Sequence, residues 1–172
     1  MPDVRPHQTM PLAFIDTELE ELALLLFTPI ESAPRTFRHD LLSAESFDFS
    51  VSSLKELDAY LLRVRKHPSV NAEWNRTVLR AGAYVGEVVR RALPPGAYHW
   101  VSYKVAASLD ASIASFGYGA ATAAILYKAP SSFALPLAKV EKCLQFGVGD
   151  NTEAFARVII SDACEALDPG AV

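Results

Sequence analysis

Residues 71–100 read NAEWNRTVLRAGAYVGEVVRRALPPGAYHW, and this stretch decides the fold. Apolar residues recur in steps of three and four from Trp74 to Ala92, which predicts a long amphipathic helix. The Pro-Pro-Gly sequence at 94–96 ends this helix. The period then changes to the alternation of a strand over residues 98–105. The stretch therefore predicts a central helix that leads directly into an aromatic strand.

Two glycines, Gly82 and Gly86, lie inside the predicted helix, although each costs about 1 kcal/mol relative to alanine. We expect another backbone to approach closely across both of them. The opposite, polar face of the helix is the best candidate for a working surface. It carries Glu73, Arg76, Arg80, Tyr84, Glu87 and Arg91.

Three segments of different character precede the long helix. Residues 1–11 are polar and contain prolines, and we expect this segment to be mobile. Residues 17–20 and 53–56 each run from Thr or Ser to Glu with the spacing of a capping box, which predicts a helix start at each point. A connector over residues 28–50 joins these two helices. Three phenylalanines are expected to pin it to the body: Phe37, Phe47 and Phe49.

After the aromatic strand, residues 111–127 carry no charge, and we read them as interior loop and strand. A strand over 122–128 and a shorter strand over 133–135 flank a proline-containing turn, which predicts a hairpin. Pro136 then suits the first turn of a helix that stops at Gly147.

Asp150 or Asn151 caps a last predicted helix. Because helices, strands and helices come in separate runs, the sequence predicts an α+β fold rather than an alternating one. We expect a single domain over residues 12–172, with a small antiparallel sheet packed against the long central helix and with flanking helices around it.

The composition of the chain limits the classes of function that it can have. The chain has 172 residues and a formal net charge of −4, without the basic excess that general nucleic-acid binders show. Neither a secretory signal nor a membrane span is predicted, which favours the cytoplasm. The two cysteines, Cys143 and Cys164, are expected to be free thiols that face inward. No Cys/His cluster exists, so we predict neither a metal nor a cofactor.

Six residues are candidates for binding. Arg80, Tyr84, Glu87 and Arg91 form a possible recognition stripe, because Arg and Tyr are favoured as interface anchors. Ordinary ion pairing of Glu87 with the arginines that follow it is the simpler alternative. His99 and Trp100, with Glu87 as the orienting acid, form a possible pocket at the junction of the central helix and the sheet. A packed strand histidine is the simpler alternative there.

Three motifs together resemble a family of small bacterial domains of unknown function. They are AGAYVGEVVRR at 81–91, the later Trp100, and FALPLAKVEK at 133–142 followed by Gly147 and Asp150-Asn151. In that family an AGAYxGEVxRR helix precedes a Trp-bearing strand and a PLxKVxKxLxxG helix. The resemblance covers about residues 53–160. It implies a bacterial, cytoplasmic protein and brings no established activity and no catalytic residues.

No catalytic motif supports an enzyme. The sequence contains no GxSxG elbow, no Walker loop and no HExxH, and the glycines at 117–122 are followed by a predicted strand rather than the helix of a dinucleotide site. The leading hypothesis is a non-catalytic module that binds another protein, such as an accessory or immunity-like factor. The alternative is a small-molecule-binding protein or an enzyme with a pocket at the helix–sheet junction. A homodimer is left open.

Overall fold

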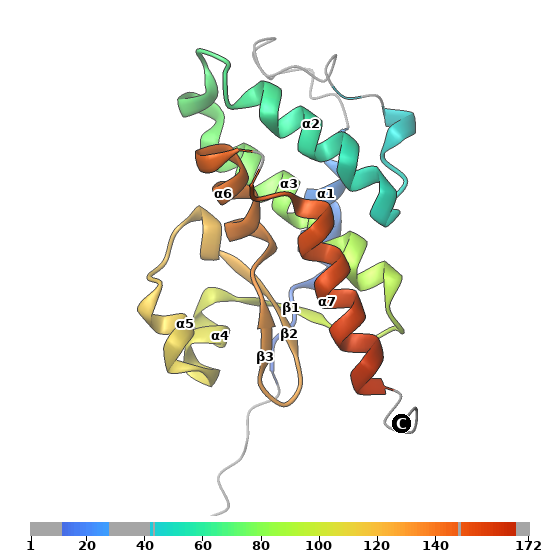
Figure 1. The fold of residues 1–172 in the computed structure, drawn as a ribbon. Coiled ribbons are helices and arrows are strands. Elements are labelled where there is room, and N and C mark those ends of the chain that lie inside the picture. Colours follow the sequence, from blue (N-terminus) through green and yellow to red (C-terminus); the bar gives the residue numbers. More distant parts are fainter. Residues whose placement is uncertain (1–11, 28–41, 43, 148, 168–172) are drawn as a thin grey trace, which may run out of the picture.

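The computed structural model describes residues 12–27, 42, 44–147 and 149–167, and Figure 1 shows its fold. The predicted α+β class is confirmed, with a small antiparallel sheet packed against a long central helix. The elements are α1 (Asp16–Leu24), α2 (Leu54–Val64), α3 (Val70–Ala92), β1 (His99–Ser102), α4 (Tyr103–Leu109), α5 (Ala111–Ser115), β2 (Ala124–Lys128), β3 (Ser132–Ala134), α6 (Pro136–Phe146) and α7 (Thr152–Leu167). The segment 1–11, expected to be mobile, lies outside the described residues.

The sheet is antiparallel, in the order β1-β2-β3. Successive side chains of a strand point to opposite faces. Trp100 of β1 and its partner Leu126 of β2 therefore belong to the main core beside α3. Their neighbours Val101 and Ile125 belong to a smaller cluster that α4 and α5 complete with the buried Ala106 and Ile113. The sheet is thus covered on both faces, as Figure 1 shows.

Helix α3 is buried on all sides over residues 81–89, because other elements surround its middle. A Cβ at Gly82 would lie 2.6 Å from the Cα of Leu137 in α6, so the expected approach of another backbone is confirmed there. A Cβ at Gly86 would overlap the Trp100 indole instead. The second glycine therefore makes room for a side chain and not for a backbone.

Helix α2 holds the connection between α6 and α7. The Asp58 carboxylate accepts hydrogen bonds from the first two backbone N–H groups of α7, at 2.8 and 3.3 Å. The Arg65 guanidinium donates to two carbonyl oxygens at the end of α6, at 3.1 and 2.9 Å. The backbone groups that helix ends leave without partners are satisfied here by a side chain of α2 and by that of Arg65, the residue directly after it. Every helix in the described part is too short or too polar to cross a bilayer.

Neither predicted capping box forms. Helix α1 already begins at Asp16, so Thr17 lies inside the helix, and the preceding Ile15 has no side chain that could cap it. The Ile15 N–H donates to the Trp100 carbonyl instead. Ahead of α2, the Ser50 hydroxyl accepts from the backbone N–H of Ser53. A short 3-10 turn therefore leads into that helix.

The aromatic strand is shorter than predicted. The Ser102 side chain accepts from the N–H of Val105 and so starts α4 inside the expected strand. Asp110 caps α5 in the same way, which corrects the reading of residues 111–115 as loop and strand. The hairpin of β2 and β3, the proline start of α6 and its end at Gly147 are confirmed. Asn151 caps α7 by accepting from the N–H of Ala154.

Candidate functional site

The predicted recognition stripe does not form one exposed surface, because Tyr84 is fully buried. Its hydroxyl is hydrogen-bonded to the Ser53 hydroxyl at 2.7 Å and accepts from the N–H of Phe49 at 3.0 Å. Its ring packs against Phe47 and Phe49. Burial raises the pKa of the Tyr84 hydroxyl, which keeps it neutral. These two phenylalanines pin the connector as predicted, whereas Phe37 lies outside the described residues.

Glu87 pairs with the arginines that follow it, as expected, but it does so in the interior, with 2% of its surface exposed. Its carboxylate accepts from Trp100 Nε1 at 2.8 Å and from Arg90 at 2.7 Å, and Arg91 Nε lies at 3.7 Å. Arg91 is exposed, stacks over a phenylalanine ring and pairs with Glu20 at 2.9 Å. Glu87 is therefore part of a structural network, not of an outer face.

Arg80 lies apart from that network, nearly two turns earlier on α3. It is half-buried, and its charge interacts with those of Glu73 and Arg76. Burial, with repulsion from Arg76, lowers the pKa of the Arg80 guanidinium. The four residues of the predicted stripe thus have three different environments.

His99 is oriented by Asp16 and not by Glu87. The Asp16 carboxylate contacts His99 Nδ1 at 2.7 Å and accepts from the backbone N–H of Trp100 at 2.6 Å. The ring of Phe14 stacks on the imidazole at 4.0 Å. No local pattern predicts this contact, because Asp16 and His99 are 83 residues apart in the sequence.

The pocket predicted from Glu87, His99 and Trp100 is not formed by the described residues. Trp100 is fully buried in the core. A hollow of about 400 Å³ does lie beside Glu87, Arg90 and Arg91, but neither His99 nor Trp100 lines it. The three side chains share a polar network and not a common cavity.

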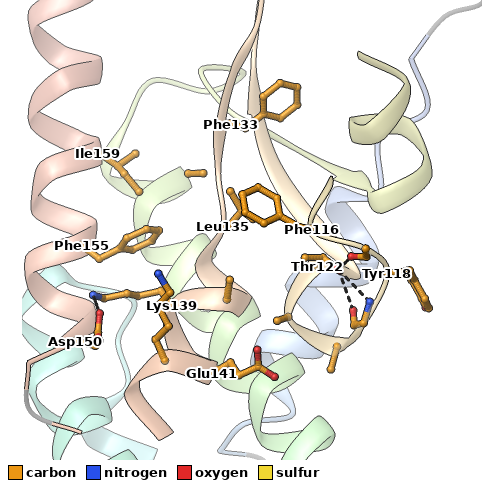
Figure 2. A pocket seen from close by; sticks show the side chains of 17 residues that line it. Phe116, Tyr118, Thr122, Phe133, Leu135, Lys139, Glu141, Asp150, Phe155 and Ile159 are labelled. Atoms are coloured by element: carbon orange, nitrogen blue, oxygen red, sulfur yellow. Dashed lines mark hydrogen bonds and ion pairs between the residues drawn. The ribbon is translucent and has the colours of Figure 1, made fainter. Parts of the chain in front are cut away.

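A larger hollow of about 650 Å³ lies between the loop at 116–122, β3, α6 and α7, and Figure 2 shows its lining. We call it the aromatic groove. Its large apolar and aromatic lining residues are Phe116, Tyr118, Phe133, Leu135, Phe155 and Ile159, of which Phe155 lies beside Lys139 in Figure 2. Its polar end is lined by Lys139, Glu141, Lys142 and Asp150.

The loop at the rim of the aromatic groove holds two aromatic side chains out into solvent. Phe116 is 63% exposed and Tyr118 is 77% exposed. Gly117 has a positive φ of 74°, which favours glycine at that turn. The Thr122 hydroxyl donates to the Gly117 carbonyl at 2.8 Å and accepts from the N–H of Gly119 at 3.0 Å. The aromatics are therefore displayed by a loop that its own hydrogen bonds hold in shape.

At the polar end, three of the four charged side chains have partners. Lys139 donates to Asp150 at 2.8 Å, and this hydrogen bond lowers the pKa of the Asp150 carboxyl. Glu141 accepts from the indole N–H of Trp74 at 3.3 Å. Lys142 is exposed and forms no direct ion pair within the described part of the chain, although its charge also helps to lower the pKa of the Asp150 carboxyl. One cation therefore remains available at this end of the groove.

The cysteines do not supply a nucleophile at the groove. Cys143 is buried as predicted, and its thiol donates to the Asp150 carbonyl at 2.8 Å. Burial, with the nearby Asp58 charge, raises the pKa of Cys143 to about 12. Cys164 is exposed, which corrects the expectation that it faces inward. In the described part of the chain no three His, Cys, Asp or Glu side chains gather to hold a metal ion.

The aromatic groove was not predicted from the sequence. Its rim belongs to the uncharged stretch that we read as interior, although the sequence Phe116-Gly-Tyr-Gly119, with aromatics set between glycines, is typical of an exposed turn. The other walls come from segments that meet only after folding. Comparisons of the chain with protein-family models, curated proteins and solved structures found no match.

Proposed function

We propose that the protein is a non-catalytic interaction module that binds another protein through the aromatic groove. The observation that carries the proposal is the pair of exposed aromatics, Phe116 and Tyr118, at the rim of an apolar hollow. Large apolar surface left in water marks interaction sites in folded proteins. Aromatic anchors also supply much of the binding energy at interfaces. The proposal keeps the predicted class of function and moves its site from α3 to the groove.

The titratable groups support binding rather than catalysis. The Cys143 thiol is buried and neutral. The pair of His99 and Asp16 is engaged in holding α1 against β1. An accessory or immunity-like role in a bacterial cytoplasm, as the family resemblance implies, remains part of the proposal.

The test is capture of partners from the native lysate with a matched set of variants. Phe116→Ser with Tyr118→Ser removes both rim aromatics, whereas Phe146→Ser removes a side chain that is 69% exposed but does not line the groove. We expect a stoichiometric partner with the wild type and with Phe146→Ser, and its loss with the double variant. A partner that all three forms retain would move the interface elsewhere on the molecule.

A small-molecule site is the second candidate, and the size of the groove favours it. A hollow of about 650 Å³ falls within the range of about 300–1,000 Å³ that is common for ligand pockets. A metabolite that raises the melting temperature of the wild type, but not that of the Phe116→Ser/Tyr118→Ser variant, would support this candidate. The exposed rim favours the protein partner, because small ligands are usually enclosed by their pockets.

A further inference from the structure

We infer that the aromatic groove takes a segment of the partner in which an apolar side chain is followed by an acidic group, and that Lys142 selects the acid. The inference rests on the proposed function and adds the chemistry of the segment to it. It follows from the positions of the charged and the apolar side chains that line the groove.

The groove has two chemically different ends. Phe133 and Ile159 lie at one end of the hollow, as Figure 2 shows. All four charged lining residues come from α6 and from the loop that follows it, at the other end. Figure 2 shows Lys139, Glu141 and Asp150 grouped away from Phe133 and Ile159. A segment that fills this groove must therefore be apolar at one end and polar at the other.

The sign of the polar group follows from the pairing at the polar end. Lys139 and Asp150 neutralise each other in an ion pair. Glu141 is engaged by the indole N–H of Trp74 from α3. Lys142 is the exposed cation of the set and forms no direct ion pair among the described residues, although its charge acts on Asp150 at longer range. Its complement is a carboxylate, and charge complementarity of this kind gives specificity more than affinity.

The rim decides between a protein segment and a small amphiphile. Phe116 and Tyr118 line the groove but are 63% and 77% exposed, so much of each side chain remains in water. A Cβ added at Gly117 or at Gly119 would meet no atom within 4 Å, so the tip of the loop faces open space, whereas residues 120–122 pack against α6 and α3. A partner larger than the groove can cover the exposed parts of both aromatics, whereas a ligand confined to the groove leaves much of them in water.

Selection from a random peptide library displayed on phage tests the inference. Four forms of the full chain serve as bait: wild type, Lys142→Glu, Lys66→Glu and Phe116→Ser/Tyr118→Ser. Lys66 is exposed beyond the end of α2 and does not line the groove, so its variant carries the same change of net charge away from the site. Peptides from the selected pools are then synthesised, and their dissociation constants are measured.

We expect the wild type and Lys66→Glu to enrich peptides with Asp or Glu beside an aromatic or aliphatic residue. Lys142→Glu should enrich Lys or Arg at that place and should bind the wild-type peptides up to about tenfold more weakly, since reversal removes an exposed attraction and adds a repulsion. The double variant should enrich neither pool.

Three results would overturn the inference, and they differ in what they imply. Apolar enrichment without an acid preference, or without its reversal in Lys142→Glu, refutes the role of Lys142 and leaves the proposed function standing. Equal enrichment by the double variant refutes the groove as the binding site and with it the proposed function. If no peptide is enriched, both proposals are refuted. Dodecanoate binding is then measured, and if Lys142→Glu weakens it, the groove is assigned to a small amphiphile.

Discussion

At the scale of single residues, the packing of Gly86 against Trp100 explains how a large indole enters the middle of the fold. The indole occupies the space in which a Cβ at Gly86 would lie, and its N–H is satisfied by the buried Glu87 carboxylate at 2.8 Å. A buried Trp needs such an acceptor, because an unsatisfied donor in the core is destabilising. The glycine and the acid on α3 are therefore both explained by one side chain on β1.

Gly86→Ala is expected to destabilise the protein. Alanine improves the helix propensity by about 1 kcal/mol, but its Cβ would overlap the indole of Trp100. Overpacking of a filled core costs about 1–3 kcal/mol and in tight sites more, so the clash outweighs the gain. Urea unfolding should show a lower free energy for Gly86→Ala. Gly119→Ala is the control, since a Cβ there meets nothing within 4 Å, and a loss of equal size in both would refute the packing argument.

The two thiols are expected to differ sharply in reactivity. Burial raises the pKa of Cys143 to about 12 from an ordinary value of 9.0, whereas Cys164 is exposed. Ellman's reagent should therefore modify one thiol of the native protein and the second only after unfolding, and the native Cys164→Ser variant should be inert. Because the native pKa is raised, the contribution of Cys143 to stability is complete below pH 9 and is lost as the pH rises from 9 to 12. Rapid modification of native Cys164→Ser would contradict this account.

At the scale of elements, α2 acts on the ends of two other helices. Asp58 satisfies N–H groups at the start of α7, and Arg65 satisfies carbonyl groups at the end of α6. Both helices supply walls of the aromatic groove. The position of α2 therefore bears on the shape of the groove, although no residue of α2 lines it.

Asp58→Ala should loosen the start of α7. The change removes the acceptor of two backbone N–H groups, and loss of such a cap costs about 0.5–2 kcal/mol. Hydrogen exchange should accelerate in the first turn of α7, and the melting temperature should fall. Glu56→Ala, at an exposed position on α2, should change neither quantity. Unchanged protection of α7 in Asp58→Ala would show that Asn151 caps the helix sufficiently alone.

The sequence predicted the elements whose signals are local. Each of these signals lies within the segment that it shapes. They are the apolar residues that recur in steps of three and four in α3, the proline at the start of α6 and the turn of the hairpin. The capping boxes at 17–20 and 53–56 were wrong because other hydrogen bonds set those helix starts. Helix α4 was missed because alternation over 98–105 resembled one strand, whereas the Ser102 cap ends the strand early.

At the scale of the whole molecule, the candidate site was harder to predict than the fold. Burial of the stripe on α3 depends on the connector, whose Phe47 and Phe49 cover Tyr84. Likewise, α1 supplies the acid that orients His99. A polar residue on a helix face is expected to be solvated until such long-range partners are known. The aromatic groove has the same origin, because it is assembled from segments between residues 116 and 159.

The N-terminal helix is joined to the body by ion pairs of two kinds, and this allows a matched comparison. Asp16 contacts His99 Nδ1, the Trp100 N–H and Arg90, and its side chain is 24% exposed. Among the described residues Glu20 pairs with Arg91, and its side chain is 50% exposed. Both acids belong to α1, so a variant of either removes one negative charge from the same helix.

Asp16→Ala should destabilise the docking of α1 much more than Glu20→Ala. The first change leaves a backbone N–H of β1 and a histidine without their acceptor, a loss of about 1–3 kcal/mol. The second removes an exposed pair worth about 0.2–1 kcal/mol, which salt screens further. Hydrogen exchange over Leu19 and Ala23, which are buried against the core, should accelerate in Asp16→Ala and remain near wild type in Glu20→Ala. Similar exchange in both variants would mean that apolar packing alone holds α1, since Leu19, Ala23 and Leu26 remain buried in either case.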